Sequence, residues 1–183
     1  MGFPKGHFTG RSKNMTSIKR NIIFLLIIWL FAAGCGVYSF TGASIPPGAK
    51  TISIAYFVNN AQYVEPSLSQ SLTDALRDRF QAQTDLDFVN EEGDLQIEGY
   101  ITDYSTRPVA IQGNETAALN RLSVTVKVKY TNTLDPTKDF ENPFTRFEDY
   151  SSDQDLSAVK DQLISTINEN LVDDIFNKAV VNW

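Results

Sequence analysis

Apolar and polar residues alternate along four segments of the chain, and each alternation predicts a β-strand. The clearest alternation covers residues 120–131, where one face is aliphatic or aromatic and the other is polar. Residues 51–58, 94–103 and 140–150 show weaker forms of the pattern, and the last of them is rich in aromatic residues. In the segment 51–58 the pattern puts Ile52, Ile54, Tyr56 and Val58 on one face, which we expect to be buried. Together, the four segments predict a sheet in which one face of every strand is buried.

Two other segments repeat their apolar residues every three or four positions, which predicts amphipathic helices. The first follows Pro66, a residue favoured in the first turn of a helix, and the second runs from near Asp155 almost to the end. The predicted order is therefore β-α-β-β-β-α. We expect an α+β two-layer sandwich, in which two helices pack on one face of a four-stranded, mostly antiparallel sheet. The other face of this sheet must be polar or covered by a partner.

An apolar run from Ile22 to Ala33 precedes these elements and leads to the only cysteine, Cys35. Its length of about a dozen residues is typical of a signal peptide, and a transmembrane helix needs roughly 20. The basic residues Lys19 and Arg20 precede the run, and small residues precede the cysteine. This stretch resembles a bacterial lipoprotein leader, which implies cleavage before Cys35 and its modification with fatty acyl chains such as palmitate. Two or three such chains make a stable membrane anchor.

A secretory signal or a transmembrane helix with an incidental cysteine is the alternative interpretation. In the lipoprotein interpretation, residues 1–34 form the signal peptide. If translation begins at Met15, residues 1–14 result from an overcalled start and are not translated. Residues 35–49 form the lipidated N-terminus and a tether, and residues 50–183 form a single domain. Resemblance to other lipoproteins implies attachment to the outer membrane, facing the periplasm, because glycine rather than aspartate follows the cysteine and no acidic run comes next.

Cleavage before Cys35 changes both the charge and the available chemistry of the protein. It removes five basic and no acidic residues, so that the formal net charge moves from −6 to −11. Such an acidic domain is poorly suited to bind nucleic acid, because that binding depends on neutralising phosphates. The only histidine, His7, is also lost. Histidine-based catalysis, zinc sites and disulfides are therefore excluded, and we predict no cofactor, no metal and no enzymatic activity.

Two remaining patterns deserve comparison with known sites. Ser157 and Lys160 fit the S-x-x-K pair of penicillin-binding proteins, but the accompanying S-D-N and K-T-G motifs are missing. The acidic residues at positions 91, 92 and 94 lack the spacing of a calcium-binding loop. We therefore expect a helix N-terminus around Ser157 and a turn at Gly93.

Four stretches of the sequence together resemble one family of lipoproteins. In chain order they are CGVYSFTGASIPPGAKTISIAYF, LTDALRDRF, DLQIEGYITDYSTRPVAI and ETAALNRLSVTVKVKYTNT, followed by the long terminal helix. They are similar to the Bacteroidetes-type form of LptE, an outer-membrane lipoprotein of lipopolysaccharide (LPS) assembly. This resemblance implies a fold of two helices on a four-stranded sheet. It also implies that the protein plugs a large LptD-like β-barrel, helps the barrel assemble and assists the passage of LPS to the outer leaflet.

A row of basic residues on the polar face of residues 120–131 is a candidate site for LPS. Arg121, Lys127 and Lys129 lie on that face, and Arg107 precedes them in a predicted loop that contains proline. Cations on a rigid strand suit anionic phosphates. Alternatively, the residues form a solvated face whose lysines discourage edge pairing. The predicted turn at 113–116 is a candidate contact with a barrel.

Two other functions remain open from the residues alone. Another periplasmic lipoprotein adaptor, such as an activator of a cell-wall synthase, would share the anchor, the acidic domain and the lack of catalytic groups. A small lipoprotein enzyme would instead use carboxylates or the Ser157 and Lys160 pair.

Overall fold

The computed structural model describes residues 2, 45–109 and 118–180. The chain divides into two units at residue 40, and every helix and strand described belongs to the second unit. The predicted signal peptide, Cys35 and the predicted turn at 113–116 lie outside the described residues. The elements are, in order, β1 (Thr51–Ile54), β2 (Val58–Asn59), α2 (Leu68–Gln83), β3 (Asp87–Phe88), β4 (Leu95–Val109), β5 (Leu119–Asn132), the 3-10 helix η1 (Pro136–Lys138), β6 (Phe140–Ser151) and α3 (Leu156–Val180).

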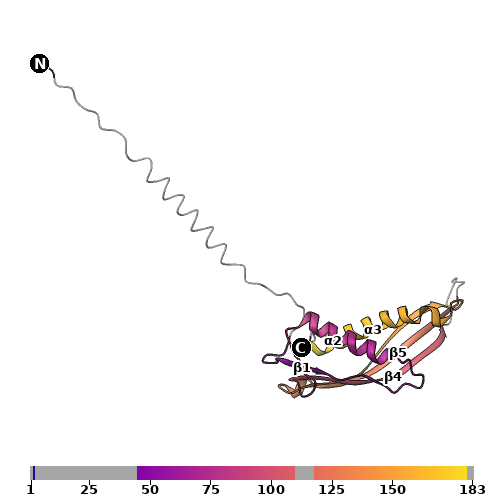
Figure 1. The fold of residues 1–183 in the computed structure, drawn as a ribbon, viewed down its shortest axis with the longest axis horizontal. Coiled ribbons are helices and arrows are strands. Elements are labelled where there is room, and N and C mark those ends of the chain that lie inside the picture. Colours follow the sequence, from indigo (N-terminus) through magenta and orange to yellow (C-terminus); the bar gives the residue numbers. More distant parts are fainter. Residues whose placement is uncertain (1, 3–44, 110–117, 181–183) are drawn as a thin grey trace. The chain divides into compact units, whose positions relative to one another are not determined.

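The strands of the described residues join one mixed sheet in the order β3-β1-β4-β5-β6, with β2 also paired to β4. Figure 1 shows this sheet beneath the two helices. The predicted α+β class is confirmed, but the prediction of four strands was wrong, because the described residues form six. The two additional strands, β2 and β3, are two residues long, which is too short to show an alternating pattern. The long strands β4, β5 and β6 are antiparallel, whereas β1 runs parallel to both of its neighbours. The chain between β1 and β4 contains α2, the kind of crossover that parallel neighbours require.

The predicted strand at 51–58 is interrupted between β1 and β2. The prediction placed Tyr56 and Val58 on the buried face, but each side chain is 53% exposed. Phe57 is instead fully buried, and its backbone N–H donates to Thr73 Oγ1 of α2 at 3.1 Å. Gly99 of β4 leaves room for its ring, because a Cβ at position 99 would lie 2.5 Å from a ring carbon of Phe57. Because of this interruption, the Phe57 side chain points into the core, and those of Tyr56 and Val58 point toward solvent.

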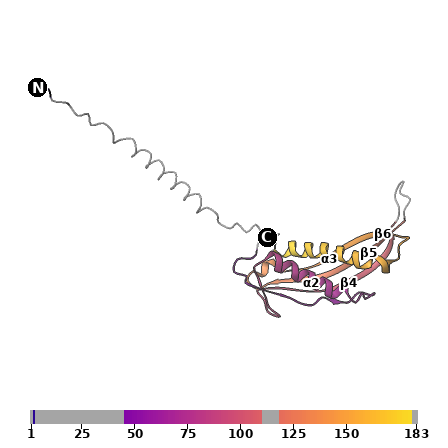
Figure 2. The ribbon, with the colours of Figure 1, turned by 45° about the horizontal axis from the view of Figure 1, so that its top comes forward.

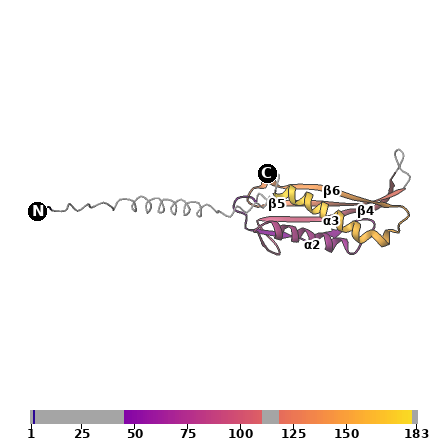
Figure 3. The same ribbon diagram turned by 90° about the horizontal axis from the view of Figure 1, so that it is seen from above.

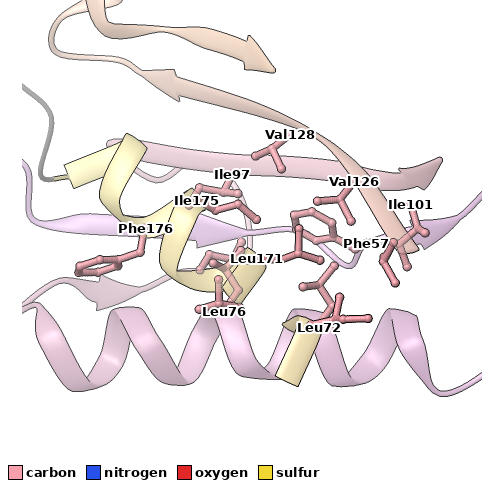
Figure 4. Close-up of a cluster of buried hydrophobic side chains, with 14 of the residues drawn as sticks. Phe57, Leu72, Leu76, Ile97, Ile101, Val126, Val128, Leu171, Ile175 and Phe176 are labelled. Atoms are coloured by element: carbon pink, nitrogen blue, oxygen red, sulfur yellow. The ribbon is translucent and has the colours of Figure 1, made fainter. Parts of the chain in front are cut away.

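Both helices lie on the same face of the sheet (Figures 2 and 3). Asn168 contacts Ser71, and Phe176 packs edge-on against Phe80 with ring centroids 4.9 Å apart. These pairs follow the same order along both helices, so α2 and α3 run parallel. Figure 4 shows the core between the helices and the sheet, where β4 and β5 meet α2 and α3. Burial of each large aliphatic or aromatic side chain contributes roughly 1.5–3 kcal/mol.

The alternation in β5 sets which face of the sheet is covered. Its even-numbered residues are buried against the helices, as predicted: Leu122, Val124, Val126, Val128 and Tyr130. Its odd-numbered residues face the opposite side, where no described helix or strand covers the sheet. We call this side the open face. Among the described residues, no helix is both long and apolar enough to cross a membrane.

Candidate functional site

The open face carries all four basic residues predicted to bind an anionic ligand. Arg107 was predicted to lie in a loop, but it lies in β4, directly opposite Arg121 of β5. Pro108 is tolerated in this strand because it lies on a free edge. On the side of β4 away from β5, β2 pairs only as far as Ile101, and no other described strand pairs with β4 beyond that point. The register thus brings two arginines together at the end of the face where β4 ends and β5 begins.

Arg121 forms the best-defined ion pair on the open face. Its Nε and Nη2 atoms donate to the two carboxylate oxygens of Asp149, at 2.7 and 2.8 Å. This two-point hydrogen bond raises the pKa of Arg121 and lowers the pKa of Asp149. The guanidinium also lies 3.6 Å from the ring centroid of Phe147, an exposed aromatic residue of β6. Arg121 is therefore held in place from two sides, by a carboxylate and by an aromatic face.

The two lysines lie nearer the opposite end of β5, and each has a carboxylate partner. Lys127 Nζ is 2.6 Å from Glu141 of β6, and Lys129 Nζ is 3.5 Å from Glu98 of β4. Hydrogen bonding to Glu141 raises the pKa of Lys127, and the pKa of Glu141 is correspondingly lowered. These four side chains line a hollow of about 240 Å³ together with Gly99 and Tyr100. Because its two positive and two negative charges compensate, this hollow attracts anions weakly.

Arg107 differs from the other three basic residues. It is exposed, and its side chain forms no ion pair or hydrogen bond with any residue that the structure describes. With Arg121 opposite and Asp149 beyond, this row across the sheet has one excess positive charge. The structure thus divides the predicted basic row into a compensated pair of lysines and an arginine end with a net positive charge.

The sequence pattern did not identify the side chains that neutralise the two lysines and hold Arg121 in place. Glu98, Glu141, Phe147 and Asp149 belong to neighbouring strands, so their proximity depends on the register of the sheet. The only indication of these partners in the sequence was the alternation in residues 140–150, which puts residues 141, 147 and 149 on one face. It does not say which residues of β5 they face.

The two patterns that resembled catalytic or metal sites have structural roles. Lys160 Nζ lies 2.9 Å from Glu65 Oε2, and this pair raises the pKa of Lys160 and lowers that of Glu65. Lys160 is thus paired with Glu65, and the backbone N–H of Ser157 donates to Asp155 just before α3. Asp94 accepts hydrogen bonds from the backbone N–H groups of Lys50 and Thr51, at the start of β1. No group of three potential metal ligands occurs among the described residues.

Comparison with known proteins gives one family match. The model of the family described as "LptE: Lipopolysaccharide-assembly" matches residues 49–179. No curated protein matches the sequence at a significant level.

Several solved structures have a similar fold at low sequence identity. A minor lipoprotein from Acinetobacter baumannii is 14% identical, with 71% of this chain and 91% of that chain covered and a TM-score of 0.49. Rare lipoprotein B from Shewanella oneidensis is 15% identical, with coverages of 70% and 92% and a TM-score of 0.46. A neuraminyllactose-binding hemagglutinin homolog from Helicobacter pylori is 8% identical, with coverages of 77% and 88% and a TM-score of 0.48. All three TM-scores are below 0.5, so the family assignment rests on the family model.

Proposed function

The chain belongs to the LptE lipopolysaccharide-assembly family, and from this premise we propose that it is the lipoprotein component of an outer-membrane LPS translocon. In this role, acyl chains on Cys35 hold the domain at the periplasmic side of the outer membrane. The domain plugs a large LptD-like β-barrel, helps that barrel assemble and assists delivery of LPS to the outer leaflet. The observation that carries this proposal is the family match over residues 49–179, which covers nearly all of the predicted domain.

The surface of the domain supports a binding role. The lumen of a large outer-membrane barrel is polar. The open face is polar too, and three of its ion pairs run from strand to strand, through Arg121, Lys127 and Lys129. These paired charges can enter a polar lumen without the cost of burying an isolated ion, which is several kcal/mol.

We further propose that LPS binds at the arginine end of the open face. Arg107 supplies the cation that lacks a carboxylate partner among the described residues, and Arg121 lies directly across from it. A guanidinium matches phosphate with two parallel hydrogen bonds, and the exposed ring of Phe147 offers an apolar surface beside it. Lys127 and Lys129 contribute less to binding, because their charges are already matched by Glu141 and Glu98.

The test is to extract outer membranes gently with detergent and to recover the protein through a C-terminal tag. Mass spectrometry then identifies the proteins recovered with it. We expect a large β-barrel in stoichiometric amount, and we expect its loss in a Cys35→Ala variant, because that variant has no acyl anchor. Recovery of the protein alone would contradict the proposal. Recovery with a cell-wall synthase would favour a different adaptor role.

A further inference from the structure

A groove of about 410 Å³ opens between α2 and α3, on the helical side of the sheet. Ser67, Ser71 and Ala75 line one side of the groove; Ser67 is the N-cap residue of α2 and the other two lie in it. All three are small and follow one another at intervals of about one helical turn, which leaves space between the helices. On the α3 side the groove is lined by Asp161, Ser165, Asn168 and Glu169 and by one aliphatic residue, Ile164.

Asn168 provides the first indication that the groove binds a ligand. Its side chain is only 3% exposed, and its amide nitrogen donates to Ser71 Oγ at 2.9 Å. Its Oδ1 atom is buried and accepts no hydrogen bond from any residue in the described ranges. Buried carbonyl groups without a donor are rare in folded proteins, because each forfeits the hydrogen bond it would form in water. The groove therefore lacks a hydrogen-bond donor at this position.

The charges along the groove provide a second, independent indication. Asp161 and Glu169 are exposed, and neither forms an ion pair within the part of the chain that the structure describes. They are eight residues apart on α3, which is about 12 Å along a helix. Of the described residues lining the groove, none is basic. The nearby Lys160 is held by Glu65. The groove consequently offers two exposed carboxylates, at Asp161 and Glu169, and one neutral acceptor, Asn168 Oδ1.

We propose that this groove is a docking site for an arginine-bearing segment of a second protein. The guanidinium lies between the Asp161 and Glu169 carboxylates and donates toward Asn168. An arginine suits this site better than a lysine, because its five donors spread over a planar fork and reach several acceptors at once. The acidic excess of the chain, 22 Asp and Glu against 16 Lys and Arg, also attracts a basic partner.

This inference does not depend on the proposed role in LPS assembly. The groove lies between α2 and α3, the two helices that cover one side of the sheet (Figure 3). Arg107 and Arg121 lie on the open face of the sheet. The two surfaces therefore lie on opposite sides of the sheet. An anionic lipid or a nucleic acid is a poor occupant, because Asp161 and Glu169 repel its phosphates.

Site-specific photo-cross-linking of the full chain in its own membrane tests this docking site. Ser165 lines the groove and is exposed, so the photoreactive residue p-benzoylphenylalanine replaces it. Asp161→Asn with Glu169→Gln removes both charges and keeps the side-chain shapes. Asp74→Asn with Asp78→Asn is the matched control, since it removes two exposed charges of α2 outside the groove. Thermal unfolding of every variant verifies that the domain is folded.

We expect a cross-link to one segment of another protein that carries an arginine next to the linked residue. Its yield falls about tenfold in the Asp161→Asn, Glu169→Gln variant and stays unchanged in the control. Changing the partner's arginine to glutamate lowers the yield in the same way, and Asp161→Lys with Glu169→Lys restores it. The proposal is overturned by a cross-link to lipid, to a second copy of this chain or to a segment without a basic residue. The proposal is also overturned if no cross-link forms, or if the cross-linking yield does not change when the Asp161 and Glu169 charges are removed.

Discussion

Replacing Phe57 with alanine tests the break between β1 and β2. There the structure buries Phe57 in the core, although the alternation predicted that its neighbours Tyr56 and Val58 would be buried instead. The Phe57 ring is fully buried, whereas the neighbouring Tyr56 is 53% exposed. Truncation of a buried phenylalanine costs roughly 3–5 kcal/mol, because apolar burial is lost and a cavity remains. Truncation of an exposed aromatic residue usually costs about 1 kcal/mol or less. Tyr56→Ala is therefore a matched control at the adjacent position.

The assay is urea unfolding of the detergent-purified protein, followed by circular dichroism. With a slope of roughly 2 kcal/mol per molar urea, Phe57→Ala lowers the unfolding midpoint by roughly 2 M. We expect Tyr56→Ala to change it by less than about 0.5 M. Equal losses for the two variants, or a larger loss for Tyr56→Ala, would refute the assignment of Phe57 to the core.

Gly99 offers an internal check on the same contact. A Cβ at this position would lie 2.5 Å from the Phe57 ring and 2.6 Å from the backbone oxygen of Lys127. Gly99→Ala is therefore destabilising, and part of its cost disappears when Phe57 is already alanine. The part that remains comes from the backbone clash. A coupling free energy above about 0.5 kcal/mol between the two substitutions supports the contact, and strict additivity contradicts it.

Three further predictions concern the charged residues. Arg107→Ala weakens binding of purified LPS about tenfold, because it removes a charged hydrogen bond, whereas Lys127→Ala weakens binding less than about twofold. Equal losses of affinity would contradict an LPS site at the arginine end of the open face. The lowered pKa of Glu65 stabilises the fold above the usual glutamate pKa of about 4.3, and this stability is lost as pH falls through the folded-state value. Glu65→Gln should therefore flatten acid unfolding curves, and an unchanged curve would refute this role. Ser157→Ala should leave LPS delivery unchanged, because Lys160 is held by Glu65; loss of delivery would indicate a catalytic serine.

The sequence predicted those parts of the fold whose residues repeat over a long stretch. The alternation in β5 and the apolar stripes of α2 and α3 each span ten or more residues, and all three elements formed as expected. The two-residue strands β2 and β3 were missed, because pairing with a neighbour rather than any local pattern defines them. Phe57 was assigned to the wrong face, because a regular alternation was extended through an irregular segment.

The candidate site was predictable only within single strands. Arg121, Lys127 and Lys129 share the open face, as the alternation of β5 required. Pro108 suggested a loop around Arg107, but β4 continues to Val109. A proline fits there because, among the described residues, no strand pairs with the outer edge of β4 beyond Ile101. The carboxylates that compensate the lysines come from β4 and β6, and their positions follow from the register of the assembled sheet.

Depletion of the protein tests the proposal that it assists delivery of LPS to the cell surface. Newly made LPS is labelled in depleted cells, and its arrival at the outer leaflet is measured with a probe that does not cross the outer membrane. We expect labelled LPS to stop reaching the probe while its synthesis continues, and we expect the wild-type chain to restore delivery. Normal arrival of LPS at the surface of depleted cells would contradict the proposed function.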